Sequence, residues 1–519
     1  MKWAVRSAAT GKTSRASDDR PGQASAFSRE TIDRRFAMET SEIKYGLHAA
    51  APDLLKSVPA LGQLKKYYPA YIKIAEQAQV VSRRFAREEM LPAVQQTDCR
   101  CAEDPRYFDW DLWRRANAQK LTIASIPRQL GGLGWHALAN AVMVEELASA
   151  CLATASNIAF NTFGLLGAMV ECRTGTVLKI IRRMVEAQKK GQPLFWSWAI
   201  TEPSAGTDME EGEAMAAMRP STLARRVAGG YVINGTKCFI TNGSLAHFVL
   251  ANIPLDAAAP RDTMATFLIP TDAAGFSVGR VERKCGQKAS QTAELFFNDV
   301  FVPEENMWEP PGRGLRHTRE ILSITRGYIG LAGLGLARGA LERCLVYAAG
   351  KKVRGHRLID EDWVRFIIAD TIKDMAAVRN AGYNFAMALD AGHVWQLFEV
   401  LPVKASLNLL PPGLLFSGPV LSLADRPWLN SAGTYLKNRL VDEATVEDFV
   451  RHGSAVKVAG TDLAVKTAAR MLDIVGLEGL DQQHGLEKCF RDAKITQIYE
   501  GSNQANRIDL FNLEVGRLL

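Results

Sequence analysis

The sequence changes in character twice, and these changes restrict the folds that the chain can adopt. Residues 61–194 and 313–519 consist mainly of long stretches with helical periodicity, whereas residues 195–312 hold short runs of β-branched and aromatic residues. Asn234-Gly235 and Asn242-Gly243 separate such runs, and Asn-Gly between β-prone runs is a strong hairpin signal. The sequence therefore predicts a multidomain α+β protein with an all-β middle domain between two helical domains.

The predicted C-terminal domain is a bundle of long helices that an unusual segment interrupts. Helices are expected at residues 321–349, 363–389, 454–475 and 508–518. Within an insertion at about 390–450, residues 405–424 carry no charge, and their length matches a membrane span. Pro411, Pro412 and Pro419 would break a lipid-exposed helix. A buried or partner-covered loop is therefore favoured over a membrane contact through this segment.

Residues 1–60 are predicted to form an N-terminal extension that is partly disordered. The formal net charge of the chain is +7, and residues 1–37 hold eight Lys/Arg and four Asp/Glu, which is +4 of it. A basic tail on a nearly neutral body gives little support for nucleic-acid binding. The tail lacks the apolar core of a secretory signal, and its acidic residues argue against a transit peptide. We interpret residues 1–37 as a disordered tail or as sequence upstream of a true start at Met38.

The eight cysteines are scattered along the chain. Cys99 and Cys101 form the only close pair, and no second pair at metal-ligand spacing accompanies them. We therefore predict free thiols in a reducing compartment and no metal site. The expected location is the cytoplasm, with the mitochondrial matrix as the alternative.

Four blocks of sequence carry a resemblance to a known family. They read TEPSAGTD at residues 201–208, NGTKCFITNG at 234–243, LFFNDVFVPEEN at 295–306 and RDAKITQIYEGSNQ at 491–504. In this order and at this spacing they resemble the acyl-CoA dehydrogenases, over roughly residues 70–519. The resemblance implies an N-terminal helical domain (61–194), a β-barrel-like middle domain (195–312) and a C-terminal four-helix bundle (313–519).

The resemblance also implies FAD as the cofactor. Residues 198–201 would face the flavin ring, Phe239 would lie against it and Thr241 would reach flavin N5. For Phe239, an ordinary strand aromatic is the alternative. The cofactor-binding residues implied in this way are Trp198, Ala199, Ile200, Thr201, Gly206, Thr207, Phe239, Ile240, Thr241, Lys351, Asp473, Gly476, Ser502 and Gln504.

Glu500 precedes Gly501 at a break in the chain, a pattern that alone usually marks a helix end. Removing the weakly acidic α-proton of an acyl thioester requires a carboxylate whose pKa is raised by desolvation. The resemblance implies that Glu500 is this base, because the other position that carries the base in related enzymes is Thr325. It further implies substrate contacts from Thr207, Arg326 and Gly501, with a helix-surface charge as the alternative for Arg326.

Two motifs that contact the FAD of a neighbouring subunit in the family depart here from their usual pattern. Lys351 stands where an arginine is usual, which keeps the charge but loses the bidentate geometry. Asp473 and Leu477 replace a glutamine and a glycine of the second motif. Both departures predict weakened FAD retention or an altered tetramer geometry.

The leading hypothesis is an FAD-dependent acyl-CoA dehydrogenase that forms a trans-2-enoyl-CoA, with the length and branching of the acyl chain left open. We expect an electron-transfer flavoprotein as the electron acceptor and a homodimer or homotetramer as the assembly. One alternative is a flavoenzyme of the same fold with other chemistry, such as an acyl-CoA oxidase or a desulfinase. The other is a non-catalytic scaffold that has lost FAD.

Overall fold

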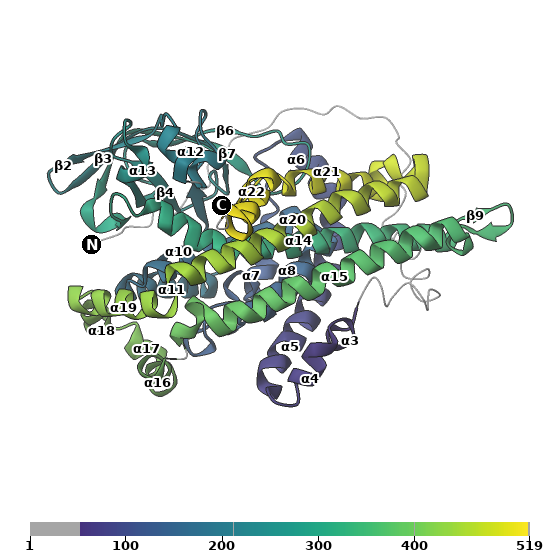
Figure 1. Ribbon diagram of the computed structural model, residues 1–519, viewed down its shortest axis with the longest axis horizontal. Helices are drawn as coiled ribbons and strands as arrows, with labels where there is room; N and C mark the ends of the chain where they lie inside the picture. Colours follow the sequence, from purple (N-terminus) through teal and green to yellow (C-terminus); the bar gives the residue numbers. More distant parts are fainter. Residues whose placement is uncertain (1–51, 211, 399, 517–519) are drawn as a thin grey trace, which may run out of the picture. The chain divides into compact units, whose positions relative to one another are not determined.

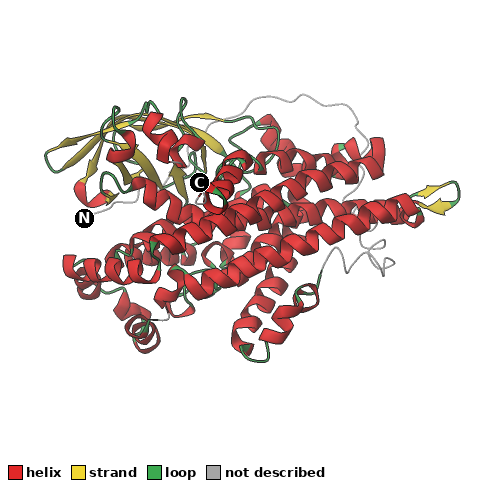
Figure 2. Ribbon diagram, viewed as in Figure 1, coloured by secondary structure: helices red, strands yellow, loops and turns green. Residues whose placement is uncertain are grey.

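The structure is a computed structural model that describes residues 52–210, 212–398 and 400–516. Most of the predicted N-terminal extension, residues 1–51, therefore lies outside the described residues. Helices form the N-terminal and C-terminal parts of the described chain, and strands gather in the middle domain (Figure 2). The predicted α+β organisation, with a β domain between two helical domains, is confirmed.

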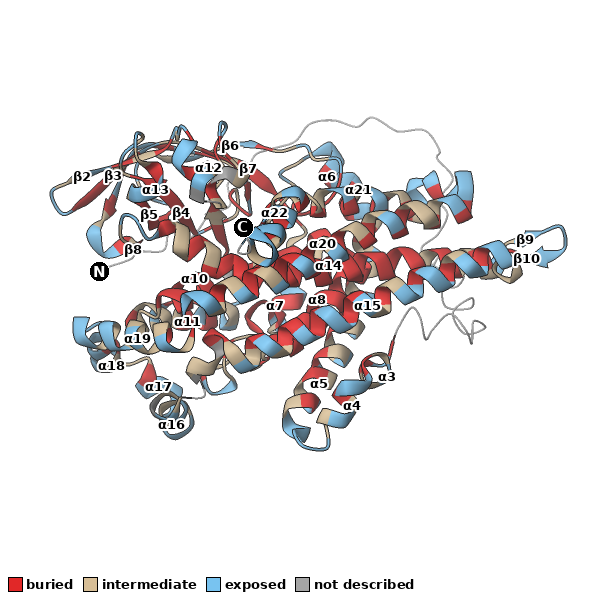
Figure 3. Cartoon of the chain, in the orientation of Figure 1, coloured by how far each residue is buried: buried red, intermediate tan, exposed pale blue. Residues whose placement is uncertain are grey.

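The N-terminal domain is centred on helix α8. Its helices are α3 (Leu54–Ser57), α4 (Pro59–Leu64), α5 (Pro69–Phe85), α6 (Val94–Glu103), α7 (Trp110–Ala118), α8 (Ala137–Ala150), α9 (Leu152–Ala159), α10 (Phe163–Glu171) and α11 (Thr174–Lys189). Every residue of α8 is buried, as its alanine-rich sequence suits (Figure 3). Helix α5 buries Ile72, Ala75 and Ala78 on one face, at the helical spacing that the sequence predicts.

The middle domain contains two four-stranded sheets, in the orders β1-β4-β5-β8 and β2-β3-β7-β6. The strands are β1 (Trp196–Ala199), β2 (Leu223–Val227), β3 (Gly230–Thr241), β4 (Phe248–Pro254), β5 (Met264–Pro270), β6 (Phe276–Val281), β7 (Thr292–Pro303) and β8 (Met307–Glu309), with the short helices α12 (Gly212–Ala217) and α13 (Pro260–Thr263). Only β1 and β4 pair in parallel among these strands. Across the described residues the sheets stay open and do not close into a barrel, and Ile233, Val249, Phe267 and Leu295 belong to the apolar core they share.

The C-terminal domain is built around α14, which is buried over most of its length. Its long helices are α14 (Gly314–Gly350), α15 (Asp362–Gly392), α20 (Glu443–Val475), α21 (Leu486–Thr496) and α22 (Asn503–Glu514). A small hairpin of β9 (Lys352–Val353) and β10 (His356–Arg357) follows α14. Helix α14 packs against α8, α15 and α20 (Figure 1). The sequence predicted α14, α15, α20 and α22 with somewhat different bounds, and it missed α21.

Helices α14 and α20 approach so closely that glycine is required where they meet. A Cβ atom at Gly460 would lie 2.0 Å from the carbonyl oxygen of Gly330, and one at Gly330 would lie 2.2 Å from the carbonyl oxygen of Val456. A Cβ atom at Gly333 would lie 2.6 Å from the carbonyl oxygen of Gly460. Because the obstacles are backbone atoms, any side chain here would push the two helices apart.

Gly460→Ala should destabilise the protein by about 2 kcal/mol, since overpacking costs roughly 1–3 kcal/mol even though alanine is the better helix former. The matched control is Gly413→Ala in α17, where an added Cβ atom meets nothing within 4 Å. This control should leave the free energy of unfolding unchanged or slightly higher. Chemical denaturation measures both variants, and equal effects would contradict the close contact.

The segment between α15 and α20 forms short helices that dock onto the rest of the domain. They are α16 (Leu401–Leu409), α17 (Pro412–Leu415), α18 (Gly418–Ala424) and α19 (Pro427–Leu440). The uncharged run 405–424 is therefore helical in pieces and not the loop that the sequence predicts, with breaks at the prolines. It buries Leu415 and Leu421, whereas Leu409 is 79% exposed. Within the described residues, no helix is both long and apolar enough to cross a membrane.

A buried ion pair fastens α19 to α14. Lys437 Nζ lies 2.8 and 3.0 Å from the two carboxylate oxygens of Glu320, and both residues are buried. Burial raises the pKa of Glu320, and the charge of Lys437 partly offsets this. The pair fixes one end of the insertion, because removing either charge would leave the other buried without compensation.

Lys437→Met should lower the free energy of unfolding by about 3–5 kcal/mol, the usual cost of leaving one member of a buried ion pair alone. Adding Glu320→Gln should recover a large part of this loss. The control is Lys466→Met, because Lys466 and Asp374 form a partly exposed pair at 2.9 Å whose loss should cost about 1 kcal/mol or less. A Lys437→Met effect as small as that of the control would contradict the docking role of the buried pair.

Candidate active site

Glu500 and Gly501 form a sharp break between α21 and α22. Their φ angles are +57° and +73°, so both residues adopt the left-handed conformation that glycine tolerates best. A Cβ atom at Gly501 would lie 2.5 Å from Glu210 Oε2, which leaves no room for a side chain. Ser502 caps α22, because its side-chain oxygen accepts a hydrogen bond from the N–H of Ala505 at 3.2 Å. A glutamate held with positive φ is an uncommon arrangement that the surrounding contacts must maintain.

The carboxylate of Glu500 is partly buried against α14. Thr325 Oγ1 donates a hydrogen bond of 2.6 Å to Glu500 Oε2. Burial raises the pKa of Glu500, and the Thr325 hydrogen bond and the charges of Arg326 and Lys457 lower it in part. The result is a carboxylate with increased affinity for a proton, which is the property that a general base requires.

Two donors hold the backbone carbonyls of this break. Lys457 Nζ, from α20, donates to the Gly501 carbonyl at 2.7 Å and to Asn503 Oδ1 at 2.6 Å. Asn506 Nδ2 lies 3.4, 3.0 and 2.9 Å from the carbonyl oxygens of Glu500, Gly501 and Ser502. Burial lowers the pKa of Lys457 to about 7. The sequence analysis missed both donors: Lys457 lies in the predicted helix 454–475, whereas Asn506 lies just before the predicted helix 508–518.

Arg326, the residue after Thr325 on α14, is buried in ion pairs. Arg326 Nη1 lies 2.5 Å from Asp509 Oδ2 and 2.9 Å from Ser454 Oγ, and Nη2 lies 3.1 Å from Glu210 Oε2. The guanidinium is 1% exposed. It therefore lies in the interior of the site beside Glu500, and it is not the helix-surface charge that the sequence leaves as an alternative.

The middle domain presents an exposed aromatic residue at a strand irregularity. The pairing of β3 with β7 shifts register between Lys237 and Ile240, and Phe239 within this bulge has φ = +58° and is 59% exposed. Thr241 is exposed at the end of β3, and the carbonyl of Thr201 accepts from the N–H of Cys238 at 2.9 Å. Bulges commonly aim a side chain at a ligand, and an exposed ring flanked by a hydroxyl suits a flat aromatic group such as flavin.

Ile240 lies in β3 and Gln504 lies in the first turn of α22, and the other predicted cofactor residues fall into two groups. Trp198 and Ala199 lie in β1, whose continuation, residues 200–201, runs beside β3, and Gly206 and Thr207 follow in the next loop. Lys351, Asp473 and Gly476 lie at or just beyond the C-terminal ends of α14 and α20, whereas Glu500 contacts Thr325 in the first third of α14. The 25 residues between Arg326 and Lys351 correspond to roughly 38 Å of helix.

Lys351 is already paired with an acidic side chain. Its ammonium group forms an ion pair with Glu478 and lies 5.7 Å from the ring centre of Tyr347. Glu478 belongs to the turn Gly476–Leu480, which follows α20 and contains Leu477 with 87% exposure. The two motifs that depart from the family pattern therefore lie next to each other, and the charges of Lys351 and Glu478 neutralise each other.

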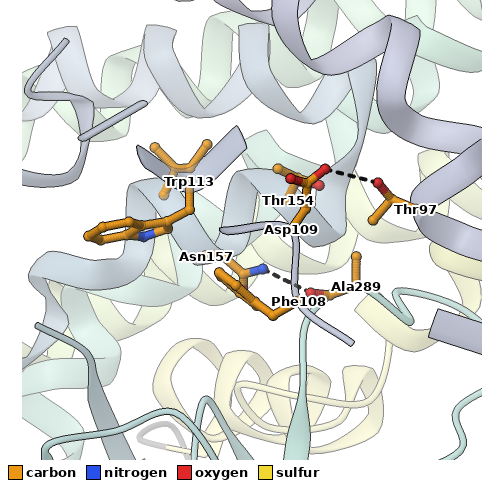
Figure 4. Close-up of a pocket in the computed structure, with 8 residues that line it drawn as sticks. Thr97, Phe108, Asp109, Trp113, Thr154, Asn157 and Ala289 are labelled. Carbon is orange, nitrogen blue, oxygen red and sulfur yellow. Dashed lines mark hydrogen bonds between the residues drawn. The ribbon is translucent and has the colours of Figure 1, made fainter. Parts of the chain in front are cut away.

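A small pocket lies between α7, α9 and the segment that precedes β7 (Figure 4). Asn157 Nδ2 donates to the carbonyl of Ala289 at 2.9 Å, and Thr97 Oγ1 donates to Asp109 at 3.3 Å. Among the described residues, Asn157 Oδ1 and the indole nitrogen of Trp113 have no hydrogen-bond partner.

Three models of protein-family domains match most of the chain. Residues 75–176 match the acyl-CoA dehydrogenase N-terminal domain, and residues 197–300 match the middle domain. Residues 312–405 and 436–511 match the C-terminal domain, and the gap between them lies within the predicted insertion. The chain belongs to the acyl-CoA dehydrogenase family, a family of oxidoreductases, as its sequence predicts.

Relatives in two bacteria are similar over most of their length. The cyclohex-1-ene-1-carbonyl-CoA dehydrogenase of Syntrophus aciditrophicus (strain SB) is 27% identical over 74% of this chain and 77% of its own. The cyclohexane-1-carbonyl-CoA dehydrogenase of Geobacter metallireducens is 26% identical over 84% of this chain and 96% of its own.

Solved structures share the fold. The butyryl-CoA dehydrogenase from Megasphaera elsdenii has a TM-score of 0.65 at 22% identity, covering 86% of this chain and 98% of its own. An acyl-CoA dehydrogenase complexed with FAD from Bacillus anthracis has a TM-score of 0.64 at 21% identity, covering 86% of this chain and 66% of its own. The predicted acyl-CoA dehydrogenase-like fold is confirmed.

Glu500→Gln should change how stability depends on pH. Because the pKa of Glu500 is raised, this group stabilises the fold below its unfolded-state pKa of about 4.3, and the contribution is lost as the pH rises through the folded-state pKa. The variant should lack this loss, which amounts to about 1.4 kcal/mol for each unit between the two pKa values.

Chemical denaturation at a series of pH values measures this difference. Glu305→Gln, which removes an exposed carboxylate of the middle domain, is the control and should follow the wild type. A Glu500→Gln curve that runs parallel to the wild-type curve would contradict a raised pKa.

Proposed function

We propose that the protein is an FAD-dependent acyl-CoA dehydrogenase that converts an acyl-CoA thioester into the trans-2-enoyl-CoA, with Glu500 as the base. The observation that carries this proposal is the Glu500 carboxylate, held with positive φ at a backbone break and with burial raising its pKa. Membership of the acyl-CoA dehydrogenase family supports it.

The reaction requires one proton and one hydride to leave adjacent carbons. Glu500 takes the proton from the α-carbon, the bond between that carbon and the β-carbon becomes double, and the hydride leaves the β-carbon. Bound FAD would supply the acceptor for that hydride. Before reaction Glu500 must be ionised, and after it Glu500 holds the proton, so a raised pKa favours the transfer.

The surrounding residues position this base. Thr325 donates to one carboxylate oxygen, which fixes the rotamer of Glu500 and leaves the other oxygen for the substrate. Lys457 and Asn506 hold the carbonyls of the break, so the carboxylate cannot swing away with its backbone. Phe239, Thr241 and Thr201 would hold the flavin, and Thr207, Arg326 and Gly501 remain the predicted substrate-side residues.

The relatives suggest which substrates to test first. Two of them are named for cyclohexane-1-carbonyl-CoA and cyclohex-1-ene-1-carbonyl-CoA, and a structural neighbour is named for butyryl-CoA. We therefore include alicyclic as well as straight-chain and branched acyl-CoA thioesters. An electron-transfer flavoprotein is the proposed electron acceptor, and a homodimer or homotetramer is the proposed assembly.

Anaerobic addition of the correct acyl-CoA should bleach the flavin absorbance of the FAD-loaded enzyme. Glu500→Gln should slow this reduction by about 10²–10⁴-fold, because it removes the general base. Glu305→Gln is the matched control and should keep the wild-type rate. Stopped-flow absorbance measures the rates, and unchanged reduction or α-proton exchange in Glu500→Gln would refute the assignment of the base.

Further experiments on the same purified protein separate the alternatives. Rapid reoxidation of the reduced flavin by oxygen, with formation of hydrogen peroxide, would indicate an acyl-CoA oxidase. Release of sulfite from a sulfinate substrate would indicate a desulfinase. The pairing of Lys351 with Glu478 motivates the third alternative, because it neutralises a predicted cofactor-binding charge. Protein that is purified colourless and cannot be reconstituted with FAD would indicate the non-catalytic scaffold.

A further inference from the structure

Two carboxylates that take no direct part in the proposed reaction hold Arg326. Asp509 comes from α22, and Glu210 comes from the short turn η6 (Thr207–Glu210) of the middle domain. Arg319, two turns earlier on α14, also reaches both residues. Its Nη1 lies 3.3 Å from Asp509 Oδ1 and 3.4 Å from the Glu210 carbonyl oxygen. Three elements of the chain thus converge on the arginine that adjoins Thr325.

Glu210 reaches the backbone immediately beside Glu500. A Cβ atom at Gly501 would lie 2.5 Å from Glu210 Oε2 and 3.1 Å from Arg326 Nη2. The absence of a side chain at position 501 therefore makes room for the Glu210–Arg326 pair. Asp509 differs from Glu210 in that it divides its charge between two arginines.

The net charge of this cluster depends on whether Glu210 is ionised. Its cations are Arg319, Arg326 and Lys457, and its carboxylates are Glu210, Asp509 and Glu500. The neighbouring Asp462 and Arg507 form an ion pair of their own. Without the charge of Glu210, Arg326 would keep only Asp509, which it shares with Arg319, so the positive charge of Arg326 would act more strongly on Glu500.

We propose that Glu210 is a positioning residue that keeps Glu500 a sufficiently strong base, by holding Arg326 and neutralising its charge. This inference rests on the proposed function, in which Glu500 removes the α-proton. An uncompensated guanidinium beside a buried carboxylate favours the ionised carboxylate, which then accepts a proton less readily. By compensating the charge of Arg326, Glu210 prevents this lowering of the proton affinity of Glu500. The hydrogen bond from Thr325 then remains the main interaction that lowers the pKa of Glu500.

Glu210 supplies its compensating charge only when its carboxyl is ionised, that is, above its own pKa. Burial raises the pKa of Glu210 to about 7, against the lowering effect of Arg326, and the charge of Glu500 raises it further. The charge of Glu500 raises the pKa of Glu210, and an electrostatic interaction of this kind acts on both groups. A change at one of them must appear in the pH dependence of the other.

The first test is the pH profile of flavin reduction in the FAD-loaded enzyme, with an acyl-CoA that the wild type oxidises. Glu210→Gln should move the acid limb of the profile to lower pH by about one unit, because one negative charge near Glu500 is lost. Glu210→Asp should restore the limb toward its wild-type position, and Glu305→Gln should leave it in place. An acid limb of Glu210→Gln that coincides with that of the wild type would overturn the proposal.

Asp509→Asn provides a second variant in case Glu210→Gln does not fold. It also removes a partner of Arg326, so its acid limb should move in the same direction, though less far because Arg319 shares that partner. If neither variant moves the limb, Glu210 and Asp509 serve the fold alone and the proposal is wrong.

The second test needs no substrate and separates the two proposals. The free energy of unfolding of the full chain is measured from about pH 5 to 8 for wild type, Glu210→Gln, Glu500→Gln and the double variant. The two substitutions should be non-additive by an amount that changes with pH. If the enzyme is active and the two substitutions have additive effects on the free energy of unfolding at every pH, the proposed role of Glu210 is wrong while the proposed function stands. If no acyl-CoA reduces the flavin, the proposed function fails whatever the cycle shows.

Discussion

The close contact between α14 and α20 is the constraint on which the candidate site depends. Gly330, Gly333 and Gly460 let the two backbones approach until added Cβ atoms would meet carbonyl oxygens at 2.0–2.6 Å. Thr325 lies on one of these helices and Lys457 on the other, and both reach the break at Glu500. If the helices were separated by one side chain, the hydrogen bonds to the carboxylate and to the Gly501 carbonyl could not both form. The packing of these two helices determines the geometry of the candidate site, because it brings hydrogen-bond donors from both helices to one short segment.

The buried charges of this protein show why Glu500 differs from a structural carboxylate. On α8, Glu145 contacts Arg379 and Arg338, and although burial opposes it, these arginines hold the pKa of Glu145 at about 2. Glu500 is partly buried, but its carboxylate accepts a hydrogen bond from the Thr325 hydroxyl and its pKa is raised. A carboxylate that is paired directly with arginines holds helices together. A carboxylate whose affinity for a proton is raised can accept a proton from a substrate.

The sequence predicted the parts of the site that depend on local signals. The break at Glu500 follows from a glycine, the β domain follows from Asn-Gly turns and β-branched runs, and the long helices follow from their periodicity. The partners of Arg326 carry no such signal, because Glu210 and Asp509 are 116 and 183 residues away from it in the chain. Helix α21 was missed because the apolar residues that it buries, Leu486, Cys489 and Ala493, stand among charged residues, two of which, Lys488 and Asp492, are themselves buried as an ion pair.

Helix α14 also explains why the unusual features of this sequence need not disturb the proposed base. Thr325 and Arg326 lie in its first third, and Lys351 follows its last residue, with most residues between them buried against α8, α15 and α20. A rigid, buried helix keeps the two ends apart, so the ion pair of Lys351 with Glu478 changes a charge far from Glu500. Electrostatic effects between such distant, solvent-screened groups are weak. The proposed base and the predicted cofactor-binding motifs can therefore vary independently. A change in FAD retention would leave the proton affinity of Glu500 to its own neighbours, Thr325, Arg326, Lys457 and Glu210.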